Sequence, residues 1–325
     1  RVDGLGVFFM SSSIQGARGG STANSLRAPS FRLGEKIIIG LLFGAAAISV
    51  GITVAIVISL FAPLPGFFEY VNPWDFITGT LWAPSFADAS FGVLPLVAGT
   101  LQVVFYAMIV GIPLGLGAAI YLSEYAGKGV RKIVKPILEV LEGLPTVATG
   151  LFAVFWFKPW IQENTPFLEW TSPFSIGVAG ITVGIITIPL IASVSDDAMR
   201  AVPMALREGA YALGATKMRV ALRVVLPAAI SGIVASFVLG ASRAIGETMV
   251  VLLVAGGGSP QLKIGFTEPA GAMTAFIASR ATGEIATGTI DYYSIFAVGS
   301  LLFLMTLTMN MIAIRFVNKF REVYD

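Results

Sequence analysis

Long uncharged stretches alternate with shorter charged stretches along most of the chain. Six apolar stretches reach about 20 residues, the length with which an α-helix crosses the hydrocarbon core of a bilayer. The third of them carries Glu139 and Glu142 near its start. The pattern predicts an all-α membrane protein with six transmembrane helices. The predicted spans are residues 37–62, 94–122, 136–157, 174–195, 228–255 and 292–314.

The segments outside the spans divide the chain into one six-helix domain and two tails. Residues 1–35 include a Ser- and Gly-rich stretch after Met10, so we expect a flexible N-terminal tail. Residues 36–318 form the transmembrane domain, in which residues 196–227 are a charged connection between the fourth and fifth spans. Residues 319–325 form a short C-terminal tail.

The composition agrees with a membrane protein and excludes several chemistries. Mean hydropathy is +0.84, apolar residues make up 56% and charged residues 12%, and this charged share is about half that of soluble chains. The net charge of +2 gives no reason to expect a nucleic-acid partner. Because the chain has no Cys and no His, disulfide bonds and catalysis that depends on histidine are excluded.

The distribution of charge predicts how the chain is oriented. Of the 21 Lys and Arg residues, 17 lie in the two tails and in the connections 123–135 and 196–227, and only three lie in the alternate connections. Since positive residues collect on the cytosolic side, both termini and the 196–227 connection are predicted to be cytosolic. All five Trp residues lie on the opposite side, where indole rings favour the headgroup region.

Residues 207–227 are predicted to form a helix, a tight turn and a second helix. Glu208 lies early, where a carboxylate suits the positive end of the helix dipole, and Gly214 supplies the bend. Pro227 suits the first turn of the fifth span. These residues alone leave two roles open. One is an amphipathic connector on the membrane surface, and the other is a docking element for a cytosolic partner.

The spacing of Glu208, Ala210, Gly214 and Leu226-Pro227 resembles that of the EAA loop in bacterial ABC importer permeases. Gly209 departs from that pattern, in which Ala is usual. The resemblance implies that a cytosolic ATPase docks on Glu208, Gly209, Ala210, Gly214, Leu226 and Pro227. The chain contains no G-x-x-x-x-G-K-[ST] motif with which to hold ATP phosphates. We therefore expect no cofactor in this chain, and ATP and Mg²⁺ bound by partner ATPase subunits.

Two charged residues, Arg243 and Glu247, lie inside the fifth predicted span. An Arg at the centre of a span costs about 2.5–3.5 kcal/mol to insert, which favours a functional position inside the bundle. The i, i+4 spacing predicts that both face one side of a helix, where Glu247 holds Arg243 in place or repels a bound anion. An ion pair that only fixes helix packing is the alternative. Beside them runs a seam of small residues that allows close helix approach: Ala228, Gly232, Ser236, Gly240 and Ala244.

The segment with these charges, SRAIGETMVVLL (242–253), resembles the GRALGETMAVL signature of PstC-type permease subunits of bacterial phosphate importers. The resemblance implies a type I ABC importer permease fold, a place in the bacterial cytoplasmic membrane, and transport rather than catalysis. It also implies a substrate pathway at Arg243 and Glu247, to which the hydroxyls of Thr146 and Thr248 would contribute. Further similar segments are FGVLPLVAGTL (91–101), AAIYLSEYA (118–126), EGLPTVATG (142–150) and IPLIASVSDDAMRAVP (188–203).

The same resemblance implies a set of partners. They are a PstA-like second permease subunit in a heterodimer, two cytosolic PstB-like ATPase subunits and an extracytoplasmic PstS-like phosphate-binding protein, besides the lipid bilayer. Charge alone does not distinguish phosphate from sulfate or molybdate as the substrate, so a permease for another oxyanion remains an alternative. An ion-coupled secondary transporter is a further alternative, although the two halves show no clear repeat and Glu247 is the only carboxylate deep in a span.

Overall fold

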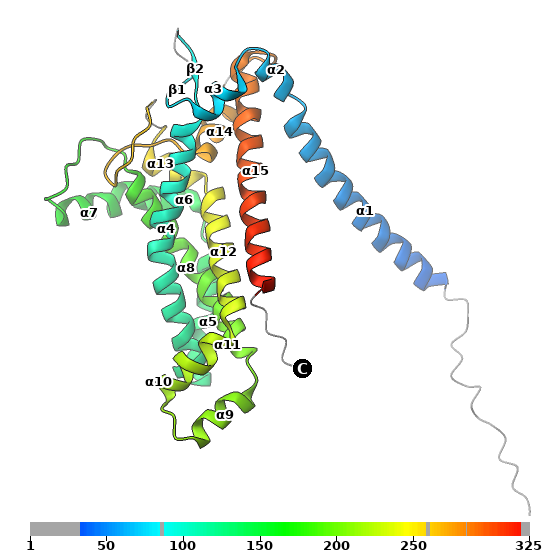
Figure 1. Ribbon diagram of the computed structural model, residues 1–325, viewed down its shortest axis with the longest axis vertical. Helices are drawn as coiled ribbons and strands as arrows, with labels where there is room; N and C mark the ends of the chain where they lie inside the picture. The colour runs from blue at the N-terminus through cyan, green and yellow to red at the C-terminus, as the bar shows by residue number, and fades with distance from the viewer. Residues whose placement is uncertain (1–32, 85–87, 258–260, 284, 320–325) are drawn as a thin grey trace, which may run out of the picture. The chain divides into compact units, whose positions relative to one another are not determined.

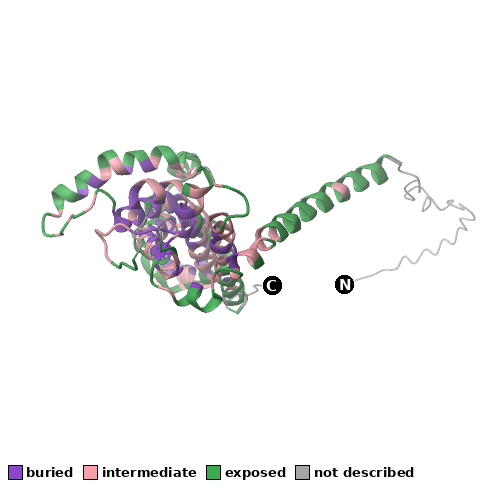
Figure 2. Cartoon of the chain, turned by 90° about the horizontal axis from the view of Figure 1, so that it is seen from above, coloured by how far each residue is buried: buried purple, intermediate pink, exposed green. Residues whose placement is uncertain are grey.

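The computed structural model describes residues 33–84, 88–257, 261–283 and 285–319. The predicted tails 1–35 and 319–325 lie outside these residues, except for 33–35 and Lys319, which are helical. The chain divides into two units, one up to Ile56 and one from Val57 onward. Most of α1 (Leu33–Phe61) belongs to the first unit, and its apolar side chains are exposed along most of its length (Figure 2). Such exposure suits a helix surrounded by lipid.

Long helices form the centre of the second unit (Figure 1). A carbon Cβ on Gly184 would lie 2.7 Å from the carbonyl oxygen of Ala107, so a larger residue there would push two of these helices apart. Close approach of small residues is the usual way in which helices associate in lipid. The helices are α4 (Leu94–Ile120, continued by the π-helical turn η2, Tyr121–Tyr125), α8 (Ile176–Arg200), α12 (Ile230–Gly246) and α15 (Ile290–Lys319).

The described residues contain four helices that are long and apolar enough to cross a membrane, and six spans if each of two bent helix pairs counts as one. The four helices are α1, α4, α8 and α15, which agree with the predicted first, second, fourth and sixth spans. The third and fifth predicted spans correspond to the parts that are bent or broken. The predicted count of six spans is reached only when each bent pair is taken as one span, and the assumption of continuous helices is wrong for the third and fifth spans.

The third predicted span, 136–157, is wrong as a single helix. The first helix of this region, α5 (Lys128–Glu142), ends before Gly143, and the helices that follow run at 89° to it. Pro145 explains the break, because proline disfavours a helical conformation at the residue before it and has no N–H to donate. The helices after the break are α6 (Thr146–Phe152), η3 (Ala153–Phe157) and α7 (Lys158–Asn164).

The fifth predicted span, 228–255, is also broken. Helix α12 ends at Gly246, and α13 (Met249–Ala255) starts after two residues. Glu247 is extended, with φ −67° and ψ 127°, and its carbonyl oxygen accepts a hydrogen bond of 2.7 Å from the Thr274 hydroxyl. A polar tertiary contact thus replaces a backbone bond of the helix at this point. A second bend, of 73°, separates α12 from the helical segment Lys217–Ala228.

The long connections 63–93 and 256–291 hold short packed elements and are not plain linkers. Figure 1 shows these elements at one end of the bundle and α9 and α10 at the other. Phe67, Phe76, Trp82 and Phe276 are all buried there, and the Trp82 and Phe276 rings meet edge to face at 5.0 Å. The elements are α2 (Leu64–Phe68), α3 (Pro73–Thr78), the antiparallel strands β1 (Trp82–Ala83) and β2 (Ser90–Phe91), and α14 (Met273–Ala281).

Candidate functional site

The predicted helix–turn–helix in the charged connection is confirmed. It consists of α9 (Met204–Ala212), a turn at Gly214, and α10 (Lys217–Val220), which leads through η4 (Ala221–Val225) and α11 (Leu226–Ala228) into α12. Gly214 has φ +79°, a conformation that other residues adopt only with strain. The hydroxyl of Thr216 accepts a hydrogen bond from the Arg219 N–H and caps α10. We call residues 204–228 the docking element, after the role that the sequence predicts for them.

One face of the docking element is exposed and partly apolar. Glu208 and Gly209 lie on its surface, and Leu213 is 90% exposed. A Cβ on Gly209 would meet no atom within 4 Å, so the departure from the usual Ala creates no packing defect in this chain. The opposite face, which includes Ala210 and Leu226, packs on the cluster around Met199 and Val220. The exposed face suits contact with a partner.

Arg207, which sequence reasoning missed, anchors the docking element to two transmembrane helices. Its guanidinium donates hydrogen bonds of 2.7 Å to the carbonyl oxygen of Val202 and 2.8 Å to that of Met199. It also pairs with the Glu124 carboxylate at 3.0 Å, and the two side chains are only 11% and 5% exposed. Because Glu124 lies in η2, which continues α4, and Met199 lies in α8, a displacement of α9 would act directly on both helices.

Arg243 lies near the end of α12, and its carboxylate partner is Glu142, not Glu247. One terminal nitrogen of Arg243 lies 3.5 Å from the Glu142 carboxylate, and the other donates a hydrogen bond of 3.1 Å to the Glu142 carbonyl oxygen. The two side chains are 27% and 36% exposed. The predicted pairing of Arg243 with Glu247 on one helical face is therefore wrong, because the helix ends between them.

Glu247 instead organises the start of α13. Its carboxylate accepts hydrogen bonds from the backbone N–H groups of Thr248, at 3.2 Å, and Val250, at 3.4 Å. The residue is only 8% exposed, so these bonds, together with the contact of its carbonyl oxygen to Thr274, satisfy its buried polar groups. A carboxylate in this position also suits the positive end of a helix.

The break in the third predicted span and the break in the fifth lie next to each other. A Cβ on Gly150 of α6 would lie 2.9 Å from the Leu253 side chain of α13. Thr146 begins α6 and Thr248 precedes α13, and both are partly buried. The Thr248 hydroxyl donates to the carbonyl oxygen of Gly246 at 3.1 Å. Thus the helices that carry the two threonines pack together in the region of the contact between Arg243 and Glu142.

The predicted seam of small residues is confirmed from Gly232 to Gly240, where α12 packs on α8, whereas Ala228 lies in α11, before the 73° bend. The Ser236 hydroxyl lies 2.7 Å from that of Ser195, and both are fully buried. A Cβ on Gly240 would lie 2.9 Å from the Ile191 side chain. Since α12 is held so closely, the position of Arg243 at its end depends on α8, the helix to which Arg207 also attaches.

These features define a multi-span helical membrane subunit with a separate docking element at one end. The chain belongs to the family of binding-protein-dependent transport system inner membrane components, which it matches over residues 111–321. It is therefore a multi-pass protein of the cytoplasmic membrane and a transport subunit, not an enzyme. Members of this family work with an ATPase and with a binding protein.

Individual relatives agree with this assignment. The probable ABC transporter permease protein YqgH of Bacillus subtilis is 30% identical over 276 residues, 84% of this chain and 87% of the relative. The phosphate transport system permease protein PstC of Haemophilus influenzae is 32% identical over 248 residues, 71% of this chain and 77% of the relative. PstC of Mesorhizobium japonicum is 30% identical over 288 residues, 83% of this chain and 86% of the relative.

Solved structures show the same fold. A bacterial ABC transporter involved in the import of alginate aligns with a TM-score of 0.57 and 18% identity, over 90% of this chain and all of the other. The MetNI methionine ABC transporter aligns with a TM-score of 0.50 and 20% identity, over 71% of this chain and 94% of the other. The fold is thus that of a type I ABC importer permease, as the sequence predicted.

Proposed function

We propose that the chain is a permease subunit of an ATP-driven importer that moves inorganic phosphate across the bacterial cytoplasmic membrane. The observation that carries the proposal is the similarity to permeases named for phosphate transport, at 30% and 32% identity over most of their length. The surroundings of Arg243 support it, because this guanidinium is partly exposed and loosely held.

Arg243 is suited to receive an oxyanion in passage. Its planar fork of N–H donors matches the oxygens of a phosphate group, and it stays charged at any physiological pH. Since the contact with the Glu142 carboxylate is long and partly exposed, an arriving anion would exchange with that carboxylate. The carboxylate competes again as the anion leaves, which keeps binding weak enough for passage. The hydroxyls of Thr146 and Thr248 would add donors, and Glu247 would contribute by fixing the start of α13.

The partners of the proposed importer follow from the same assignment. We infer a heterodimer with a PstA-like permease subunit, two PstB-like ATPase subunits and a PstS-like phosphate-binding protein outside the membrane. ATP and Mg²⁺ would be bound by the ATPase subunits. Both termini and the docking element would face the cytosol, in line with the distribution of Lys and Arg. The ATPase would dock on the exposed residues Glu208, Gly209, Gly214 and Pro227, whereas Ala210 and Leu226, also predicted to dock, would hold the element against the cluster around Met199 and Val220.

The role of Arg243 is tested by Arg243→Ala in the assembled importer. We expect phosphate uptake to fall about tenfold or more, which corresponds to the loss of one charge-assisted hydrogen bond or ion contact. Co-purification of all subunits should be unchanged, because the Arg243 contacts are long and partly exposed. Unchanged uptake kinetics would remove Arg243 from the pathway. Competition by sulfate and molybdate in the same assay decides between phosphate and another oxyanion.

The docking role is tested by Glu208→Lys, with Glu163→Lys as a control. Both residues are exposed, and Glu163 lies on α7, outside the docking element. We expect Glu208→Lys to abolish ATP-coupled uptake while membrane insertion persists, and Glu163→Lys to leave uptake intact. Normal uptake in the Glu208→Lys variant contradicts the docking role. Uptake that ignores ATP depletion but collapses with an uncoupler indicates a secondary transporter instead.

A further inference from the structure

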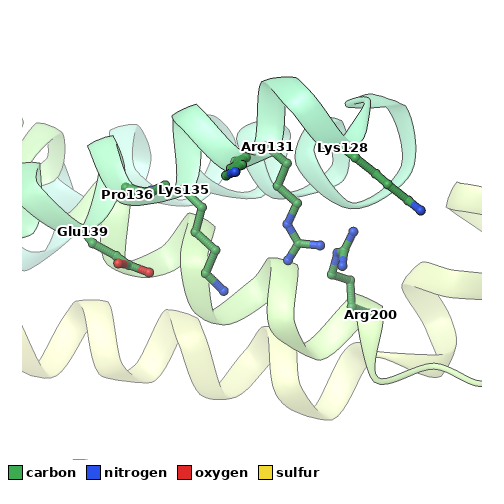
Figure 3. Close-up of a pocket in the computed structure, with 7 residues that line it drawn as sticks. Lys128, Arg131, Lys135, Pro136, Glu139 and Arg200 are labelled. Atoms are coloured by element: carbon green, nitrogen blue, oxygen red, sulfur yellow. The ribbon is translucent and has the colours of Figure 1, made fainter.

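A basic groove lies between α5 and the end of α8, separate from Arg243. It encloses about 550 Å³, within the range of small-ligand sites. Figure 3 shows the guanidinium groups of Arg131 and Arg200 pointing toward one another across it. The lining residues are Lys128, Arg131, Lys132, Lys135, Pro136 and Glu139 of α5 and Arg200 of α8.

Two acidic residues beside the groove pair with three of its cations. Arg131 donates to the Asp196 carboxylate at 2.6 Å, and that carboxylate is only 1% exposed. Arg200 lies 3.6 Å from the other oxygen of the same carboxylate, and Lys135 pairs with Asp197 at 2.5 Å. Two guanidinium groups therefore share one buried carboxylate, and their remaining N–H donors are available to a ligand.

The other lysines of the groove are not neutralised. Within the described part of the chain, Lys128 and Lys132 make no hydrogen bond or ion pair. With these two included, five cations face three carboxylates around the cavity. Unpaired cations that line a concave surface attract an anion, because the low-dielectric walls focus their field. The groove thus carries an excess of positive charge that favours an anion.

The groove is connected to Arg243 through a single helix. The polar residues of α5 recur every three or four positions and so lie along one side of the helix. They begin with Lys128 and Arg131, continue through Lys135 and Glu139, and end with Glu142, the partner of Arg243. A helix of this length covers roughly 20 Å. At the other end, Arg200 closes α8 shortly before the docking element begins.

We propose that the basic groove binds the phosphate group of an anionic ligand, as a second anion site between Arg243 and the cytosol. The proposal rests on the proposed function in taking inorganic phosphate as the first source of this group. An anionic lipid headgroup is the second source with the same chemistry. Successive weak sites of one charge sign allow an anion to leave a first site without being trapped at a second.

A single introduced thiol provides the test, because the chain has no cysteine. Pro136 lines the groove, is exposed and carries no charge, so Pro136→Cys is placed in the full importer reconstituted in nanodiscs of neutral phosphatidylcholine. The measurement is the rate at which an anionic and a cationic methanethiosulfonate modify this thiol. We expect the anionic reagent to be favoured, and millimolar inorganic phosphate to slow it more than chloride of equal ionic strength does.

Matched variants distinguish a specific anion site from a non-specific effect of positive charge on the reagents. Lys128→Gln with Lys132→Gln should lower the preference for the anionic reagent by about fivefold or more, because each removed charge both attracts the anionic reagent and repels the cationic one. It should also abolish protection by phosphate. Lys128→Arg with Lys132→Arg should retain both effects. Arg315→Gln removes an exposed cation outside the groove and should also leave both effects unchanged.

The source of the phosphate group is decided by lipid composition. Protection by inorganic phosphate in neutral nanodiscs indicates the free anion. If instead phosphatidylglycerol in the nanodisc slows the reaction without added phosphate, and Lys128→Gln with Lys132→Gln removes this effect, the ligand is a lipid headgroup. The proposal is overturned if neither source protects the thiol. Combining Pro136→Cys with Arg243→Ala keeps the two sites distinct. Phosphate should still protect the groove thiol in this variant, whatever effect Arg243→Ala has on uptake.

Discussion

Two arginines, Arg207 and Arg243, each reach a glutamate far away in the sequence, but they are held very differently. Arg207 makes three hydrogen bonds of 2.7–3.0 Å, and its pair with Glu124 joins side chains that are 11% and 5% exposed. Arg243 makes one hydrogen bond of 3.1 Å and one ion contact of 3.5 Å to Glu142, with side chains that are 27% and 36% exposed.

The difference makes Arg207 an anchor and suits Arg243 to the binding role that we propose for it. A guanidinium has five N–H donors, and Arg207 uses its terminal donors on short bonds to buried acceptors, so a ligand would have to break them. Among the described residues, Arg243 contacts only Glu142, through longer and more exposed contacts, which in the proposed function an anion would replace. The same residue type thus fixes the docking element to α4 and α8 at one position and offers a replaceable contact at the other.

The largest expected effect is that of Arg207→Met. The substitution leaves the buried carboxylate of Glu124 without its cation, which typically costs about 3–5 kcal/mol. We expect a marked fall in the thermal unfolding midpoint of the purified importer in detergent and a loss of coupling between ATP hydrolysis and uptake. Arg243→Ala in the same unfolding assay should cost less than about 1 kcal/mol, as exposed pairs do.

A double variant shows whether the loss comes from the orphaned carboxylate. Replacing Arg207 and Glu124 together by Met removes both charges and should recover part of the unfolding midpoint, since apolar replacement of a whole buried pair is often tolerated. A double variant as unstable as Arg207→Met alone would mean that the carbonyl contacts to Met199 and Val202, not the ion pair, anchor the docking element.

An intermediate effect is expected for Gly214→Ala in the docking element. At φ +79°, a side chain costs about 1–2 kcal/mol, so the element should loosen and become more sensitive to limited proteolysis. Gly209→Ala is the matched control. Gly209 lies within α9, and a Cβ there would meet no atom within 4 Å. The substitution should therefore stabilise the helix by about 0.5–1 kcal/mol. Equal effects of the two substitutions would show that the turn conformation at Gly214 is not needed.

Much of the fold could be predicted because it depends on local sequence. The lengths of the uncharged stretches predicted α1, α4, α8 and α15, since any helix in a bilayer needs about the same number of apolar residues. Gly214 predicted a turn because its backbone freedom is a property of the residue itself. The seam through Gly240 predicted a close helix contact for the same reason: a fixed spacing of small residues lies on one helix face.

The breaks and the ion pairs could not be predicted in this way. The partners of Arg131, Arg207 and Arg243 are 65, 83 and 101 residues away, and spacing along one helix gives no information about them. The i, i+4 spacing even suggested a wrong partner for Arg243, because it assumes that the helix continues. A tertiary bond from Thr274 to the Glu247 carbonyl oxygen stabilises the break. Pro145 was the one local signal of a break that sequence reasoning left unused.

The smallest effect is expected for Glu142→Gln, which tests the loose contact itself. The substitution keeps the carbonyl oxygen that Arg243 contacts and removes only the carboxylate charge at 3.5 Å. The unfolding midpoint should change by less than the equivalent of about 1 kcal/mol. Uptake should slow by at most about fivefold, the factor that corresponds to this energy, because a neutral amide competes less well with the departing anion. If Glu142→Gln lowers the unfolding midpoint as far as Arg207→Met does, then Arg243 is an anchor of the same kind as Arg207. The greater exposure of Arg243 would then not indicate a different role.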